Sequence, residues 1–329
     1  MEMQSNQSCL DECYDIAIVG SGISCAYTLI NYLSLLEQRS LPRIVKVAVL
    51  EKSGEFWAGI PYGSRSGRNT LVISSLKEFI PQELERSQFV SWLSQNRHWI
   101  FDIPEYKYGK LSNKWLEINE VYMAQGLWDE LFIPRFTFGL YLQHRLTQLI
   151  ESATTKGILQ LSLLASEVKD IQPVNGLYKV DMAIASGHES LLAKKVILTI
   201  GSQSDRVINY FPEVENDICF VNNLYEPSQD FNIHRICEFL ERPENQAPSQ
   251  VLILGANASA LEVLYCLSDS QRASGLISKF FVLSPSAAFP HRINHEVRQS
   301  PYFPRYLTSL IESKSFTARQ ILEAMKSEV

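Results

Sequence analysis

The sequence has little glycine and few cysteines. Only 15 glycines and 6 cysteines occur in 329 residues, and no C-x-x-C pair or zinc-type Cys/His cluster is present. Thiols scattered through apolar segments are typical of a reduced, cytoplasmic protein. Because glycine is scarce, we expect each glycine to occupy a position that needs its conformational freedom.

An excess of basic charge is also missing. Thirty Lys and Arg residues against 36 Asp and Glu give a net charge of −6, and the longest basic cluster is Lys194-Lys195. Nucleic-acid binding requires a basic surface, so this partner is not expected. No H-E-x-x-H pattern or third ligand accompanies His291 and His295, so no metal site is predicted. The sequence identifies no catalytic acid–base pair.

Membrane and targeting signals are absent as well. The first residues lack the basic region of a signal peptide. Residues 16–36 carry no charge and are numerous enough to span a bilayer. They divide, however, into a strand-like half and a helix-like half at Gly20-Ser21-Gly22. We therefore expect a β-turn-α unit here and no membrane partner.

The first 51 residues have a β-α-β pattern. An apolar, β-branched strand covers 14–19, a helix with one apolar face follows to about residue 39, and a second strand covers 44–50. This order predicts a parallel sheet with a right-handed crossover.

The turn between this strand and helix has dinucleotide-binding chemistry. Gly20 makes the tight turn, Gly22 leaves room for a pyrophosphate, and the helix N-terminus offers free N–H groups. Cys25 takes the place of the third glycine, and Glu51 ends the second strand, where a carboxylate accepts hydrogen bonds from ribose hydroxyls. An acid at this position favours FAD or NAD over NADP. The predicted cofactor-binding residues are Gly20, Ser21, Gly22, Ile23, Ser24, Glu51, Lys52 and Gly201.

The rest of the chain alternates irregular and regular stretches. Residues 52–135 are aromatic-rich and irregular, with helical pieces expected at 85–96 and 120–130. The later helices are expected at 136–151, 261–267, 305–312 and 317–328. The later strands are expected at 159–164, 168–171, 177–183, 195–200, 251–254 and 280–283, and Gly201 ends the fourth of these.

The predicted fold class is α/β, with two Rossmann-like dinucleotide-binding domains built on parallel sheets with helices on both faces. Residues 1–205 would form an FAD-binding domain that contains the aromatic-rich insertion 52–135. Residues 206–329 would form a smaller NAD(P)-binding-like domain with a helical C-terminal tail.

The chain resembles a family of FAD/NAD(P)-binding proteins related to N-hydroxylating flavin monooxygenases and, more distantly, to two-dinucleotide-domain oxidoreductases. The matching stretches are YDIAIVGSGISCA, GIPYGS, FVSWL, FIPRFTFGLYL, VILTIG and VLILGANASALEVL. The resemblance implies an FAD pyrophosphate at Gly20–Ser24 and its ribose on Glu51. It also implies that Trp57 and Tyr62 lie near the isoalloxazine, Val168 near the adenine and Arg135 near the cofactor. Packing for the two aromatic residues, and an ion pair for Arg135, remain alternatives.

The second β-α-β unit departs from the family pattern. Asn257 replaces the middle glycine after Gly255, and Ser284-Pro285-Ser286 stands where the family has an arginine-rich stretch. This unit therefore either binds NADP or NAD or is a Rossmann unit without a ligand. The residues predicted to contact NADP or NAD are Gly255, Asn257, Ala258, Ser259 and Ser284.

Two functions follow from these features. The first is an FAD-dependent oxidoreductase, an NAD(P)H-dependent monooxygenase that hydroxylates a small substrate through a flavin hydroperoxide. The alternative is an FAD-binding, non-catalytic or partner-dependent subunit. Beyond Pro290 there is neither an apolar strand nor a glycine. The chain is therefore expected to be a shortened form, or to have its flavin site completed by a homo-oligomer or a second polypeptide.

Overall fold

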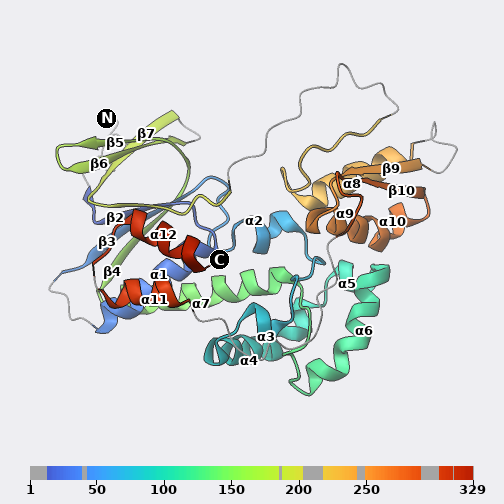
Figure 1. Ribbon diagram of the computed structural model, residues 1–329, viewed down its shortest axis with the longest axis horizontal. Helices are drawn as coiled ribbons and strands as arrows, with labels where there is room; N and C mark the ends of the chain where they lie inside the picture. Colours follow the sequence, from blue (N-terminus) through green and yellow to red (C-terminus); the bar gives the residue numbers. More distant parts are fainter. Residues whose placement is uncertain are drawn as a thin grey trace, which may run out of the picture. The chain divides into compact units, whose positions relative to one another are not determined.

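The computed structural model describes residues 13–38, 43–184, 187–202, 218–242, 249–289, 304–313 and 315–328 (Figure 1). The chain divides into two compact units, Met1–Pro290 and His291–Val329. The predicted domain boundary between residues 205 and 206 lies outside the described residues, so the two-domain division stays a prediction.

A parallel sheet is the centre of the first unit. Its strands, in spatial order, are β4 (Leu159–Ala165), β3 (Val45–Glu51), β2 (Ile16–Val19) and β8 (Val196–Leu198). All three pairings are parallel, and α1 (Ile23–Gln38) connects β2 to β3. β2 and the middle of β3 are almost wholly apolar because both faces of the sheet are buried. The predicted β-α-β unit is confirmed.

Helices cover one face of this sheet. α1 and α7 (Arg135–Thr155) pack against Ile18, Val47 and Val49. The apolar stripe of α1 points inward as its periodicity predicted, and Leu29 and Leu33 are almost fully buried. α7 includes the helix expected at 136–151 and extends it at its C-terminal end.

A second sheet covers the opposite face. It contains β5 (Glu167–Val174), β6 (Leu177–Ile184), β7 (Gly187–Ala193) and the short β1 (Cys13–Tyr14), in the order β1-β7-β6-β5. Val180 and Met182 of β6 pack against Ala17 and Leu50 of the parallel sheet. The α/β class with parallel sheets is confirmed, but the expectation of helices on both faces is wrong for this sheet. Figure 1 shows the layer of β5, β6 and β7 opposite α1 and α7.

The aromatic-rich insertion is helical. It contains α2 (Gly59–Tyr62), the 3₁₀ turn η1 (Ser64–Ser66), α3 (Leu76–Phe79), α4 (Glu83–Ile100), α5 (Pro104–Tyr108) and α6 (Lys110–Ala124). α4 contains the helical piece expected at 85–96. The piece expected at 120–130 is wrong beyond residue 124, because the chain turns at Gly126 with φ 75.

Aromatic rings form the core of this insertion. Phe138 of α7 packs edge-on against Tyr62, Phe79 and Phe89, with ring centroids 5.4, 4.9 and 5.4 Å away. Such edge-to-face pairs add about 0.5–1.5 kcal/mol each to the gain from burial. The aromatic richness of residues 52–135 therefore serves packing against α7.

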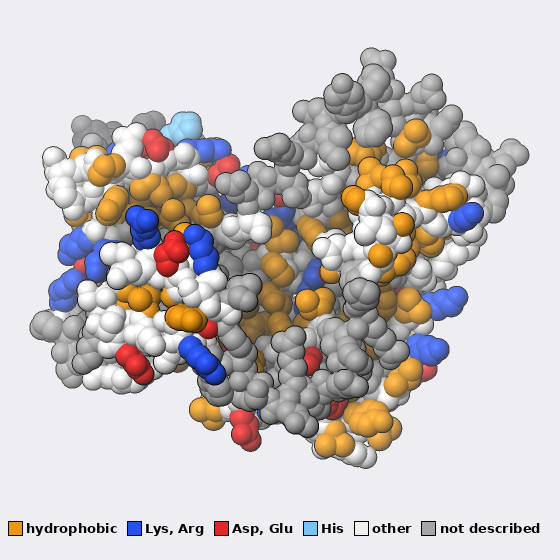
Figure 2. Space-filling view, viewed as in Figure 1, with side chains coloured by type: hydrophobic (Ala, Val, Ile, Leu, Met, Phe, Trp, Pro, Cys, Tyr) orange, Lys and Arg blue, Asp and Glu red, His pale blue; other side chains and the backbone are white. Residues whose placement is uncertain are grey.

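The second β-α-β unit contains β9 (Ser249–Leu254), α9 (Ala258–Asp269), the short α10 (Gln271–Ser274) and β10 (Ile277–Leu283). β9 and β10 are parallel, as expected, and α8 (Gln229–Leu240) shares their apolar core. The other face of this strand pair is apolar and exposed, with Leu252 and Leu254 beside Phe281 and Leu283. Figure 2 shows apolar side chains gathered on the surface over this part of the chain.

The unit His291–Val329 contains two helices among its described residues. They are α11 (Arg305–Glu312) and α12 (Ala318–Glu328), close to the ranges expected from the sequence. Glu328 of α12 accepts hydrogen bonds from the backbone N–H groups of Tyr306 and Leu307. Across the described parts of both units, no helix is long and apolar enough to cross a membrane.

Candidate functional site

The glycine turn lies at the carboxyl end of the parallel sheet, between β2 and α1. Gly20 has φ 89, and its N–H donates to the carbonyl of Leu50 at 2.8 Å. A Cβ on Gly20 would lie 2.5 Å from the carbonyl oxygen of Thr199, which follows β8. Only glycine fits this position, so the tight turn predicted from the sequence depends on β8 as well as on the local motif.

The other side of the turn faces residues 57–59. A Cβ on Gly22 would lie 3.6 Å from Cα of Gly59, an ordinary contact distance. Trp57 donates its N–H to the carbonyl of Ser21 at 2.7 Å and has φ 80, a strained conformation for a tryptophan. Strained backbone is frequently found at functional sites. The structure therefore brings Trp57 to the predicted turn, although its ring is buried in the core.

Glu51 connects the turn to the end of β3. Its Oε2 accepts hydrogen bonds from the N–H and hydroxyl of Ser21, and its Oε1 accepts from the N–H and hydroxyl of Ser53. Burial acts to raise the pKa of Glu51, but these hydrogen bonds outweigh burial and lower it. A carboxylate has about four acceptor positions, so a ribose hydroxyl would replace one of the serine hydroxyls. The neighbouring Lys52 is exposed and pairs with Glu167 at 3.3 Å.

The residues of this turn fit a pyrophosphate. Ile23 and Ser24 begin α1, and the first N–H groups of a helix have no partner within it. No side chain extends from Gly22 into the space at this helix end. Cys25, at the position of the third glycine, is fully buried, and burial raises the pKa of its thiol to about 12. The thiol is therefore neutral and acts as a packing residue.

The remaining residues expected near FAD lie on different elements. Tyr62 packs in the aromatic core and lines a pocket. Val168 lies on β5, and Gly201 follows β8 with φ 70. Arg135 begins α7 and forms a bidentate ion pair with Glu262 of α9, with N–O distances of 2.6 and 3.0 Å. Arg135 therefore forms an ion pair, which was one of the two roles considered for it. Its contact with the cofactor stays a prediction.

The second turn differs from the first. Gly255 has φ 111 and donates to the carbonyl of Leu283, as a Rossmann turn requires. Asn257 has φ −89, so it does not adopt a left-handed conformation, and its side chain caps α9 by accepting the N–H of Ala258 at 2.9 Å. The cap uses part of the helix end that would bind phosphate. Ser259 is exposed, and the Ser284 hydroxyl is buried without a hydrogen-bond partner among the described residues.

Two acidic residues of α9 were not predicted. Glu262 binds Arg135, and the Tyr225 hydroxyl donates to the same carboxylate. Asp269, only 2% exposed, accepts hydrogen bonds from the Asn69 amide, from the N–H groups of Leu111 and Ser112, and from the Ser112 hydroxyl. These bonds attach α9 to the insertion. No local pattern indicates them, because the partners are distant in sequence.

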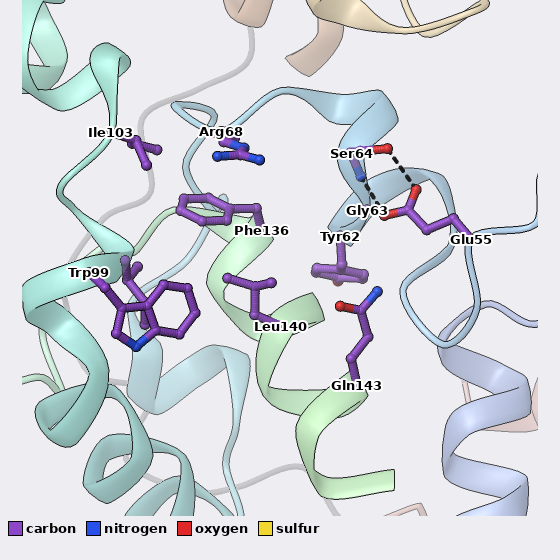
Figure 3. A pocket seen from close by; sticks show the side chains of 11 residues that line it. Glu55, Tyr62, Gly63, Ser64, Arg68, Trp99, Ile103, Phe136, Leu140 and Gln143 are labelled. Atoms are coloured by element: carbon purple, nitrogen blue, oxygen red, sulfur yellow. Dashed lines mark hydrogen bonds between the residues drawn. The ribbon is translucent and has the colours of Figure 1, made fainter. Parts of the chain in front are cut away.

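A pocket of about 180 Å³ lies beside the aromatic core (Figure 3). Its lining side chains come from the segment after β3, the end of α4 and the start of α7, and include Tyr62, Trp99 and Phe136. The sequence predicted Tyr62 near the cofactor but did not indicate this pocket.

Comparison with known proteins identifies the family of this chain. A family model described as FAD-NAD(P)-binding matches residues 17–203, more than half of the chain. The chain therefore belongs to this FAD-NAD(P)-binding family. The match confirms the predicted family and the cofactor class, FAD with NADP or NAD. It includes the first glycine turn and ends before β9.

Curated relatives of this chain share less than a third of its residues. Uncharacterized proteins of Mycobacterium tuberculosis and Mycobacterium bovis are 28% identical over 318 residues, which is 96% of this chain. The chain spans 59% of the length of these curated relatives.

The solved structures that match this chain include two ornithine hydroxylases. An ornithine N-hydroxylase from Kutzneria sp. 744 is 16% identical, with a TM-score of 0.44 over 95% of this chain and 62% of that one. An ornithine hydroxylase from Pseudomonas aeruginosa is 15% identical, with a TM-score of 0.47 over 82% of this chain and 53% of that one.

Proposed function

We propose that this chain is the FAD-binding part of an NAD(P)H-dependent monooxygenase that hydroxylates a small substrate. The observation that carries the proposal is the glycine turn Gly20-Ser21-Gly22, held by Glu51 at the N-terminus of α1. Membership of the FAD-NAD(P)-binding family supports the choice of cofactor. When bound, FAD would supply electron transfer from NAD(P)H and the activation of O₂.

The residues of the chain would have binding and positioning roles. The backbone N–H groups of Gly22, Ile23 and Ser24 would hold the pyrophosphate, and Glu51 would accept a ribose hydroxyl. Trp57 and Tyr62 would border the flavin, because the segment that contains them begins with a hydrogen bond to the turn. The buried aromatic core beside Tyr62 would exclude water from the reacting face.

One observation favours a second function, an FAD-binding subunit that depends on a partner. The Asn257 side chain caps α9 and so competes with a phosphate for the second site. In this form, NAD(P)H binding would come from a second polypeptide, and a homo-oligomer or that second polypeptide would complete the flavin site. We place either form in the cytoplasm, a proposal supported by the buried thiols of Cys25, Cys237 and Cys266.

An absorbance spectrum with coenzyme titration tests both functions. We expect the purified chain to bind FAD stoichiometrically and NADPH or NADH to bleach the flavin under anaerobic conditions. Bound FAD that neither coenzyme bleaches would support the partner-dependent subunit. A colourless chain that takes up no added FAD would contradict both.

A glycine variant tests the placement of the cofactor. Gly22→Val should abolish FAD binding, because the side chain would fill the space for the pyrophosphate. Gly275→Val is the matched control, since Gly275 has φ −87 and no atom within 4 Å of its Cβ position. Stoichiometric FAD in the Gly22 variant would refute this placement.

A further inference from the structure

The pocket beside α7 has an apolar wall. The apolar side chains that line it include Trp99 at the end of α4, Ile103, and Phe136 and Leu140 of α7. Its volume of about 180 Å³ is similar to that of a dry protein cavity known to bind benzene, about 150 Å³. The pocket therefore has room for an apolar body of about one six-membered ring.

A cation lies on one side of this wall. Arg68 lines the pocket, and its guanidinium forms no hydrogen bond or ion pair with any residue that the structure describes. It lies close enough to Asp230 to act on that carboxyl: burial raises the pKa of Asp230, and the Arg68 charge opposes this effect. By contrast, Arg65 and Arg86 form ion pairs with Glu226 and Asp129. A guanidinium has five N–H donors that match a carboxylate, so Arg68 is available to bind an anionic group.

Glu55, the acidic residue among those that line the pocket, is already hydrogen-bonded to Ser64. Glu55 accepts hydrogen bonds from the N–H of Ser64 at 2.8 Å and from its hydroxyl at 2.9 Å. Figure 3 shows Arg68 above Phe136 and Leu140, and Glu55 apart from them beside Ser64. The negative charge of Glu55 would keep an anion away from its side and favour the Arg68 side.

We infer that this pocket binds a small carboxylate with an apolar body. The carboxylate would pair with Arg68, and the body would lie against Trp99, Phe136 and Leu140. The inference deepens the proposed function, on which it rests for the role of the ligand as substrate. Binding itself requires no flavin.

Calorimetric titration of the full chain, with and without added FAD, tests this site. The probes are phenylacetate, its neutral isostere phenylacetamide and the cationic benzylamine. We expect phenylacetate to bind at least tenfold more tightly than either other probe. Equal binding of all three, or no binding of phenylacetate, would overturn the inference.

Variants separate the carboxylate contact from general binding. Arg68→Gln should remove the preference for phenylacetate over phenylacetamide, and Leu140→Trp should weaken both by filling the pocket. Arg235→Gln, at an exposed position on α8, is the control and should retain the preference. A preference that survives in the Arg68 variant would refute the assignment.

The carboxylate site and the proposed flavin function can be contradicted independently of each other. A chain that binds FAD but not phenylacetate contradicts only the carboxylate site. A chain that binds phenylacetate but not FAD contradicts only the proposed flavin function.

Discussion

Glu51 holds Ser21 by two hydrogen bonds, with the backbone N–H at 2.8 Å and the hydroxyl at 3.1 Å from the same carboxylate oxygen. The other oxygen binds the N–H and hydroxyl of Ser53. The end of β3 thereby fixes the glycine turn that begins α1. A residue expected to bind a ribose also supports the turn that would bind the pyrophosphate.

Glu51→Gln should weaken both functions of this residue. An amide places an NH₂ group against N–H and O–H donors, and leaving such groups unsatisfied costs about 1–3 kcal/mol. We expect this loss in the free energy of unfolding, measured in urea, together with at least tenfold weaker FAD binding. Glu130→Gln, on an exposed position, is the control and should change neither. Unchanged stability would contradict the structural role.

Gly20→Ala should destabilise the chain far more than Gly176→Ala. Both glycines have positive φ, 89 and 78, so alanine at either costs about 1–2 kcal/mol of backbone strain. Only at Gly20 would the new Cβ meet backbone, at 2.5 Å from the Thr199 oxygen. We expect a further loss of about 1–3 kcal/mol there from overpacking. Equal midpoints in urea unfolding would contradict the close approach of β8 to the turn.

Asp15 should make the stability depend on pH in acid. Its carboxylate binds Arg43 at 2.7 Å and Lys194 at 2.9 Å, and the Arg43 contact, with help from the others, lowers the pKa of Asp15 despite burial. The folded state therefore binds its proton less readily than the unfolded chain. This contribution is fully present above about pH 4, the ordinary Asp pKa, and is lost as the pH falls further.

Asp15→Asn tests this dependence. The variant should lose about 1–3 kcal/mol of stability at pH 7, because the Arg43 and Lys194 charges lose their partner. It should also show a weaker decrease in stability between pH 4 and pH 2 than the original chain. Parallel curves of unfolding free energy against pH would show that Asp15 contributes nothing to the decrease.

Arg135 and Glu262 should show strong energetic coupling. Their side chains are only 13% and 12% exposed, so removal of one leaves the other charge buried. We expect Arg135→Met and Glu262→Leu each to cost about 3–5 kcal/mol. The double variant should cost clearly less than the sum, since no unpaired charge remains. Additive losses in a urea double-mutant cycle would contradict a buried pair.

Local patterns predicted the first β-α-β unit well. β2, β3 and α1 follow from apolar periodicity, and the turn follows from glycine spacing. β7 was not predicted because its first residues, Gly187–Glu189, are exposed and carry no alternating pattern. The second layer on the sheet was missed for a similar reason, since strand periodicity does not specify which element a face packs against.

The candidate site was only partly predictable. The sequence indicated Gly20, Gly22 and Glu51, because their spacing along the chain reflects cofactor geometry. It did not indicate that Asn257 would cap α9, or that Arg68 would line a pocket with Leu140. These contacts depend on side-chain conformation and on segments that meet only after folding.

The sequence alone determined the family, the cofactor class and the place of the glycine turn, since each depends on residue types at short spacing. The tertiary structure decided which contacts complete that turn. The carbonyl oxygen of Thr199 leaves no room for a Cβ at residue 20. Glu51 binds Ser21, which is 30 residues earlier in the sequence. The structure also paired Arg135 with Glu262. Such pairs depend on how distant segments pack, and local periodicity carries no information about that packing.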